Sequence, residues 1–217
     1  MFNLYSIAHH CATVTLVVSM LVMFGWYAEI EILKTIIPGA VTMKFNTAFA
    51  FLFSGLILLF ALRREKYNSD WALIILPSAS MVILIFMGTT LMSVMFGFVS
   101  GIESLFVRES ANAVLTTMPG RPSIGTMLAF ILVASAGIVS IDVGRYKYIP
   151  YWIVGVLIIA LAALALLGYL LQVPEMYYAI TGISTAMAIH TAALFLLLGV
   201  GFILVGFIVR KSKDRRF

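Results

Sequence analysis

Residues 43–55 read MKFNTAFAFLFSG, and residues 187–199 read MAIHTAALFLLLG. The two segments share Met, Thr, Ala, Phe, Leu and Gly in the same register, and a weaker third copy, PSIGTMLAFILVA, occupies residues 122–134. Each copy places a short polar step and a threonine before an apolar run. Because runs of this kind enter membranes as helices, the repeated phrase predicts three helices that begin alike.

The composition places the whole chain in a membrane. Hydrophobic residues make up 63% of the 217 residues, charged residues make up 11%, and the mean hydropathy is +1.11. Soluble domains carry roughly a quarter charged residues, and a backbone in lipid must satisfy its own hydrogen bonds, which favours helices. We therefore predict an all-α integral membrane protein with six transmembrane helices. The predicted spans are residues 7–26, 44–62, 72–96, 123–142, 150–171 and 186–209.

The basic residues predict the orientation of these spans. Ten of the fourteen Lys and Arg residues fall on one side, in alternate connections and in the tail 210–217. The positive-inside rule places that side and both termini in the cytoplasm, so we expect a multi-pass protein of a prokaryotic plasma (inner) membrane. The basic rim suits anionic lipid headgroups of the bilayer and does not indicate nucleic-acid binding. The ten residues are Arg63, Arg64, Lys66, Arg145, Lys147, Arg210, Lys211, Lys213, Arg215 and Arg216.

The six predicted spans pair into three repeated helical hairpins, at about residues 7–62, 72–142 and 150–209. In each hairpin, a glycine and an aromatic residue end the first span, an acidic residue follows, and the threonine begins the second span. We expect Gly55, Gly137 and Gly199 to let helices approach closely. Segments 30–37 and 102–107 mix Leu, Ile and Phe with acids, so we expect them either to lie in the membrane interface or to fold back over the bundle, where they would roof an outward-facing cavity.

The second hairpin carries the stretches FGFVSGIESLFVRES and PGRPSIGTMLAFILVASAGIVSID. They resemble the N-terminal multi-span membrane region of bacterial and archaeal signalling proteins, which precedes PAS, histidine-kinase or GGDEF (diguanylate cyclase) modules and contains the phrase PGRMSPNTALCFLLLG. Pro119, Gly120, Arg121, Ser123 and Thr126 match that phrase, whereas residues 122, 124, 125 and 127 depart from it. The segments MKFNTAFAFLFSG, GYLLQVPEMYY and MAIHTAALFLLLG are similar to other parts of the same region.

The resemblance implies a sensory input domain and not an enzyme. We expect it to perceive a small or membrane-soluble signal at an outward-facing vestibule and to relay it to a cytoplasmic signalling protein. The sequence carries no kinase, cyclase or PAS module. The chain is therefore expected either to signal through a separate partner protein, as a single chain or as a homo-oligomer, or to form the membrane part of a longer protein. Two alternatives stay open: a non-catalytic accessory subunit of a respiratory or oxidase complex, and a carrier or channel for a small solute.

The position before the threonine differs between the copies, as Asn46, Gly125 and His190. A histidine at the end of a span can bind a ligand or sense pH, and outer carboxylates can receive a cationic ligand. The alternative is structural, with His190 bonded to a loop carbonyl and the carboxylates in surface ion pairs with Arg108 or Arg121. The predicted ligand-binding residues are Asn46, Thr47, Thr126, His190, Thr191, Glu103 and Glu175.

No cofactor or catalytic motif is evident in the sequence. A copper site formed by Met43, Met187 and His190 is a weak alternative, because soft thioethers select Cu(I) but methionine is also a common apolar filler. His9 and His10 lie roughly 20–30 Å from His190 by helix rise, which argues against a bis-histidine haem. No span centre holds a charged residue, and this weakens the carrier alternative.

Overall fold

The computed structural model describes residues 4–35, 37, 39–109, 114–141 and 148–214. Within these residues the fold is all helical, without strands and with one isolated β-bridge, between Ile180 and Ser184. The longer helices are α1 (Leu4–Tyr27), α3 (Phe45–Tyr67), α4 (Trp71–Ile83), α5 (Thr89–Phe96), α6 (Ile124–Val139), α7 (Tyr148–Leu171) and α8 (Ile189–Asp214). The short elements are α2 (Glu31–Lys34), the π-helical turn η1 (Leu84–Gly88), and the 3₁₀ turns η2 (Ile102–Ser104) and η3 (Pro174–Tyr177).

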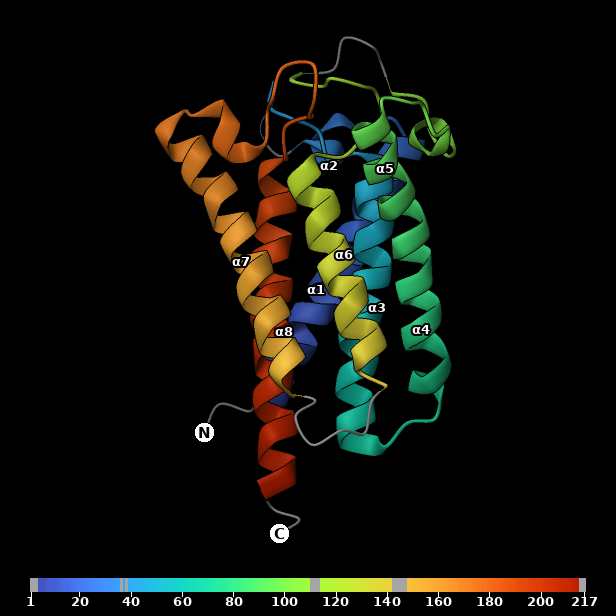
Figure 1. Cartoon of the computed structure of the whole chain (residues 1–217), viewed down its shortest axis with the longest axis vertical. Helices are drawn as coiled ribbons and strands as arrows, with labels where there is room; N and C mark the ends of the chain where they lie inside the picture. Colours follow the sequence, from blue (N-terminus) through green and yellow to red (C-terminus); the bar gives the residue numbers. More distant parts are fainter. Residues whose placement is uncertain (1–3, 36, 38, 110–113, 142–147, 215–217) are drawn as a thin grey trace.

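Helices α4 and α5 continue one another through η1, and this segment and the other longer helices stand side by side and alternate in direction along the chain (Figure 1). The described parts of the connections 28–44, 97–123 and 172–188 lie together at one end of the bundle, which we call the loop end. Each of these connections contains one short element, α2, η2 or η3. Helix α1 begins and α8 ends at the opposite end, which we call the terminal end.

Five helices are long and apolar enough to cross a membrane: Leu4–Tyr27, Phe45–Tyr67, Trp71–Phe96, Tyr148–Leu171 and Ile189–Ser212. They agree with five of the six predicted spans, and they are consistent with a membrane protein. The remaining prediction, 123–142, falls on α6, an apolar helix of only 16 residues. Residue 142, the predicted cytoplasmic residues Arg145 and Lys147, and the tail from residue 215 lie outside the described residues.

Serine side chains close both ends of α6. Ser123 Oγ accepts a hydrogen bond from the Thr126 backbone N–H (3.1 Å), which caps the start of the helix. At the other end, Ser140 Oγ donates to the Ala136 carbonyl (2.5 Å) and accepts from the Tyr151 hydroxyl (2.7 Å). At 1.5 Å per residue, α6 is about 24 Å long, against about 30 Å for a hydrocarbon core. This helix is therefore shorter than the apolar run of its sequence.

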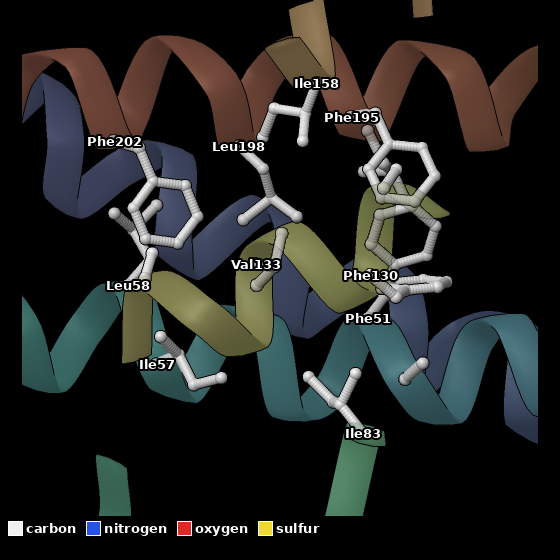
Figure 2. Packing of buried hydrophobic residues seen from close by; sticks show 14 of the residues in the cluster. Phe51, Ile57, Leu58, Ile83, Phe130, Val133, Ile158, Phe195, Leu198 and Phe202 are labelled. Carbon is white, nitrogen blue, oxygen red and sulfur yellow. The ribbon is translucent and has the colours of Figure 1, made fainter. Parts of the chain in front are cut away.

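The core lies where α3, α6 and α8 meet. Phe51, Phe130 and Phe195, which we call the Phe triad, are fully buried, and the ring centroids of each pair lie 4.7–4.8 Å apart. Figure 2 shows the three rings gathered together. Each ring comes from the same position of the repeated phrase, four residues after the threonine. Other apolar side chains continue the core toward the terminal end: Ile57, Leu58, Val133, Leu198 and Phe202 (Figure 2).

The other helices pack around these three. Helix α1 contacts α3 and α8, α4 contacts α3 and α6, and α7 contacts α6 and α8. The glycines predicted for close packing lie at such contacts: a Cβ at Gly55 would come within 2.7 Å of the Leu16 side chain of α1, and Gly137 and Gly199 press as closely on α4 and α7. Small residues thus bring the helix backbones together, as they do in membrane bundles.

The connection 97–123 folds back onto the bundle through one aromatic side chain. The Phe106 ring stacks on Phe86 of η1, with centroids 5.8 Å apart, and also meets Phe45 and Phe49 of α3. Phe106 thus packs on the bundle although it is 37% exposed, and Leu105 beside it is 60% exposed, so segment 102–107 covers the bundle only in part. The π-helical turn that presents Phe86 is not predicted by the hydropathy pattern, because one additional residue in a turn leaves that pattern almost unchanged.

Candidate functional site

Three buried threonines lie on the loop-end side of the Phe triad. Positions four residues apart share one face of a helix, so the threonine of each repeated phrase precedes its phenylalanine by one turn on the same face. Thr47, Thr126 and Thr191 are only 2–3% exposed. The structure therefore gathers these three predicted residues where α3, α6 and α8 meet, and we call them the threonine layer.

Asn46 is bound by the protein itself. Its side-chain Nδ2 lies within hydrogen-bond distance of the carbonyl oxygens of Ile102 (3.0 Å), Gly120 (3.3 Å) and Glu103 (3.4 Å). Gly120 has a φ of +74°, and a Cβ there would overlap the Glu103 carbonyl, so this close approach requires glycine. The predicted ligand residue Asn46 thus fastens the connection 97–123 to the start of α3.

Glu103 lies in a buried ion pair. Arg121 Nη2 is 3.0 Å from Glu103 Oε1, and the two side chains are 11% and 2% exposed. Ser100 Oγ donates to Glu103 Oε2 (2.7 Å), and Ser93 Oγ donates to Oε1 (3.2 Å). Burial alone raises the pKa of this carboxyl, but hydrogen bonds from Ser100, its own backbone and Arg121, with the Arg121 charge, lower the pKa below its usual value. The predicted alternative, pairing with Arg121, is what the structure contains, although it is buried and not at the surface.

A second buried ion pair joins α3 to the same connection. Lys44 Nζ lies 2.5 Å from Glu109 Oε1, with side-chain exposures of 3% and 5%, and it also donates to Thr116 Oγ1 (2.7 Å). Glu109 Oε2 accepts from the backbone N–H of Gly120 (2.7 Å). Burial lowers the pKa of the Lys44 ammonium, and Glu109 opposes this shift. This pair is not among the residues predicted from the sequence. The sequence feature that indicates it is the lysine of the repeated phrase 43–55, which stands directly before an apolar helix.

His190 occupies the position of Asn46 in the other copy of the phrase, but its ring is not bound in the same way. The residue is 6% exposed, and its Nε2 has no hydrogen-bond partner among the described residues. Thr35, the residue that ends α2, likewise has a buried Oγ1 without a partner in the described part of the chain. A buried polar atom without a partner is costly and uncommon. Among the described atoms of the predicted site residues, His190 Nε2 is the one that is buried and without a partner, so it can bond to something else.

The starts of α3 and α8 are supported by matching hydrogen bonds. Trp26 Nε1 donates to the Met43 carbonyl (2.9 Å), and the Tyr169 hydroxyl donates to the Met187 carbonyl (2.7 Å). Each methionine N–H in turn donates to the end of the preceding short helix, at Lys34 and Tyr177. Both methionine side chains, the residues of the copper alternative, are 1% exposed. The methionines thus occupy equivalent buried places.

A polar cleft of about 440 Å³ opens at the loop end, between residues 115–117 and 174–184. Its wall carries hydroxyls from Thr116, Thr117, Thr181 and Ser184, together with Glu175. Glu175 is exposed, and it is the only one of the seven predicted ligand residues on this wall. The predicted set is therefore divided between a buried layer inside the bundle and a cleft beside it.

No three His, Cys, Asp or Glu residues in the described part of the chain come together in a way that could hold a metal ion. Comparisons of the chain with protein families, with characterised proteins and with solved structures find no match. The resemblance to sensory membrane regions stays a prediction from the residues quoted above, and the function must be argued from the geometry.

Proposed function

We propose that this chain is a membrane sensory module that perceives a signal at the loop end and relays it to a cytoplasmic partner. The observation that carries the proposal is His190, a buried side chain with an unpartnered Nε2 beside the threonine layer, at the start of one uninterrupted helix. Helix α8 continues for 26 residues, about 39 Å at 1.5 Å per residue, to Arg210 and beyond at the terminal end.

The proposed topology has six spans, arranged as three repeated hairpins at about 7–62, 72–142 and 150–209. Three observations support it. Helix α6 runs between the same two ends as the five long helices (Figure 1). The first helix of each hairpin packs against the second helix of the hairpin before it, α4 on α3 and α7 on α6. Contact of α1 with α8 closes the ring between the first and the third hairpin. The bundle carries Arg63, Arg64, Lys66, Arg210 and Lys211 on helices that end at the terminal end, which the positive-inside rule assigns to the cytoplasm.

The proposed relay depends on His190 and the threonine layer beside it. A ligand changes a conformational equilibrium only if it binds one arrangement better than another. Bonding to His190 Nε2 would stabilise the arrangement that presents this atom, and the close glycine contact of α8 with α7 at Gly199 would pass a shift of α8 on to α7. Since α8 is continuous, a shift at His190 reaches Arg210.

The test joins the full chain, after Phe217, to a diguanylate cyclase module and measures cyclic di-GMP in cells. His190→Leu and Thr126→Val should each change the output by about fivefold or more, as expected for a shift of roughly 1 kcal/mol between two states. Leu73→Ala, on an exposed face of α4, is the matched control and should leave the output unchanged.

Equal output from all variants at equal protein level would refute the relay. Purification of the chain from native membranes addresses the accessory-subunit alternative, which would be favoured by stoichiometric recovery of a subunit with a redox centre. Uptake of a solute by proteoliposomes would favour the carrier alternative in the same way.

A further inference from the structure

Tyr178 separates two hollow regions of the molecule. It ends η3 with a left-handed backbone (φ +65°), and its ring packs on Gly125 at the start of α6, where a Cβ would lie 2.5 Å from the ring. Its hydroxyl donates to the Leu161 carbonyl in the interior of α7 (3.0 Å). Burial raises the pKa of Tyr178, so the hydroxyl keeps the proton that it donates. The side chain therefore fills the space between α6 and α7 close to the loop end.

On the terminal-end side of this tyrosine, α6 and α7 leave a groove of about 440 Å³ between them. Its wall consists of aliphatic side chains, and several of them are exposed on the surface of the bundle. In a membrane this surface meets the hydrocarbon of the lipids. The wall is formed by Leu128, Ile131 and Leu132 of α6 and by Leu157, Ala160, Leu161 and Leu164 of α7.

On the other side of Tyr178 lies the polar cleft described above. Ala179, the next residue in the chain, lines the cleft, whereas the Tyr178 hydroxyl contacts Leu161, which lines the groove. The cleft wall offers hydroxyl groups and the Glu175 carboxylate, and no Lys or Arg is among the residues that line it. The two regions differ in polarity, and Tyr178 is linked to the lining of both, through its bond to Leu161 and its chain neighbour Ala179.

We propose that the cleft and the groove form one binding site for a single-chain amphiphile, with a hydroxyl- or amine-bearing head in the cleft and its hydrocarbon chain between α6 and α7. The Thr117 and Thr181 hydroxyls of the wall can bond to such a head, and Glu175 attracts an amine but repels an anionic head. Tyr178 divides the site, and for its ring to turn away from Gly125 the hydroxyl has to give up one hydrogen bond, to the Leu161 carbonyl. The site requires only that the helices lie in a bilayer, and it is independent of the relay proposed above.

The test uses the full chain in phosphatidylcholine vesicles that contain a trace of a monoacylglycerol with a diazirine near the end of its acyl chain. After illumination, mass spectrometry should find the label concentrated on α6 and α7, in residues 124–139 and 148–171. Ala160→Trp fills the groove and should lower this labelling by about fivefold or more, the factor that corresponds to roughly 1 kcal/mol of lost binding. Ile74→Trp, on an exposed face of α4, is the matched control and should change nothing.

Two more variants test the head and the divider. Glu175→Lys should reduce labelling by a diazirine-bearing long-chain amine and increase labelling by the corresponding fatty acid. Tyr178→Phe keeps the ring but loses the bond to Leu161, so it should raise the labelling rate by about fivefold, as expected for one hydrogen bond. Cys11 is buried, so its failure to react with a thiol dye shows that each variant is folded.

Label spread evenly over exposed helix faces, and unaffected by Ala160→Trp, would overturn the proposal in favour of bulk lipid. If α6 and α7 are not labelled by the lipid and instead crosslink to the same helices of a second copy, the proposal would be overturned in favour of a homo-oligomer interface. Labelling by the fatty acid at the level of the amine would remove the assigned role of Glu175 and with it the proposed head.

Discussion

The connections 97–123 and 172–188 lie at the same end of the bundle, but different interactions hold them. The first is held by two buried ion pairs, Glu103 with Arg121 and Glu109 with Lys44, and by the Asn46 amide, which donates to its backbone carbonyls. In the second, the side-chain hydrogen bonds of the described residues are between neutral groups, with the Tyr169 and Tyr178 hydroxyls each donating to one backbone carbonyl. The polar cleft opens along the second connection.

This difference indicates where a ligand would act. Buried charges that are fully paired hold one arrangement firmly, because separating them leaves a charge in a poorly solvated place. Neutral hydrogen bonds contribute roughly 1 kcal/mol each, so the connection 172–188 can change shape at small cost. We infer that 97–123 serves as the fixed frame and that 172–188, with His190 at its end, is the responsive part.

Removing a charge from the frame should have the largest effect. Glu103→Ala leaves the Arg121 guanidinium buried without its carboxylate, and breaking a buried pair in this way costs about 3–5 kcal/mol. The unfolding temperature in detergent should fall accordingly, measured by the reaction of a fluorescent thiol dye with Cys11 as unfolding exposes it. Glu175→Ala removes the other predicted carboxylate, which is exposed, and should leave the unfolding temperature unchanged. Equal stability of the two variants would contradict the division into frame and responsive part.

Asn46 and His190, which precede the threonine in two copies of the repeated phrase, should respond to substitution in opposite ways. Asn46→Leu leaves the carbonyls of Ile102 and Gly120 buried without their donor, at a cost of about 2 kcal/mol. His190→Leu removes a ring whose Nε2 has no partner among the described residues, so its effect on stability should be within about 1 kcal/mol of zero, and a gain is the expected sign. The same dye assay measures both variants. A loss for His190→Leu as large as that for Asn46→Leu would show that the histidine is a structural residue.

The matching supports of α3 and α8 should each contribute a small amount. Tyr169→Phe removes only the hydroxyl that donates to the Met187 carbonyl, so it should lower the free energy of unfolding by about 1 kcal/mol. Trp26→Phe breaks the equivalent bond to the Met43 carbonyl. Because the two bonds lie in different connections, the effects should add in the double variant. A cost for Tyr169→Phe close to that for Glu103→Ala would show that the connection 172–188 is as firmly held as the frame.

The long helices could be predicted from the sequence because an apolar run is a local property. The five long apolar helices agree with predicted spans. The length of α6 could not be predicted in the same way. The helix ends at Val139, and the next residue, Ser140, accepts a hydrogen bond from Tyr151 of α7, a contact that hydropathy does not include.

The site was predictable only where the repeat determined it. The register of the phrase places Thr47, Thr126 and Thr191 at the same height, and the structure gathers them above the Phe triad. The partners of the charged groups depend on the path of a loop: Lys44 meets Glu109 from 65 residues away. Neither residue type nor spacing reveals that such a pair is buried.

The smallest expected effect is a pH dependence that belongs to the frame alone. Hydrogen bonds and the Arg121 charge hold the pKa of Glu103 below its usual value despite burial. A carboxyl whose pKa is lower in the folded than in the unfolded chain stabilises the fold fully above its unfolded value, near 4.5, and this contribution is lost as the pH falls through the folded value. The stability difference between the wild-type chain and Glu103→Gln should therefore shrink below about pH 4.5, when unfolding is followed from pH 7 downward. A constant difference for Glu103→Gln across this range would mean that the pair with Arg121 does not depend on the charge of Glu103, and the contrast between the two connections would then rest on packing and not on electrostatics.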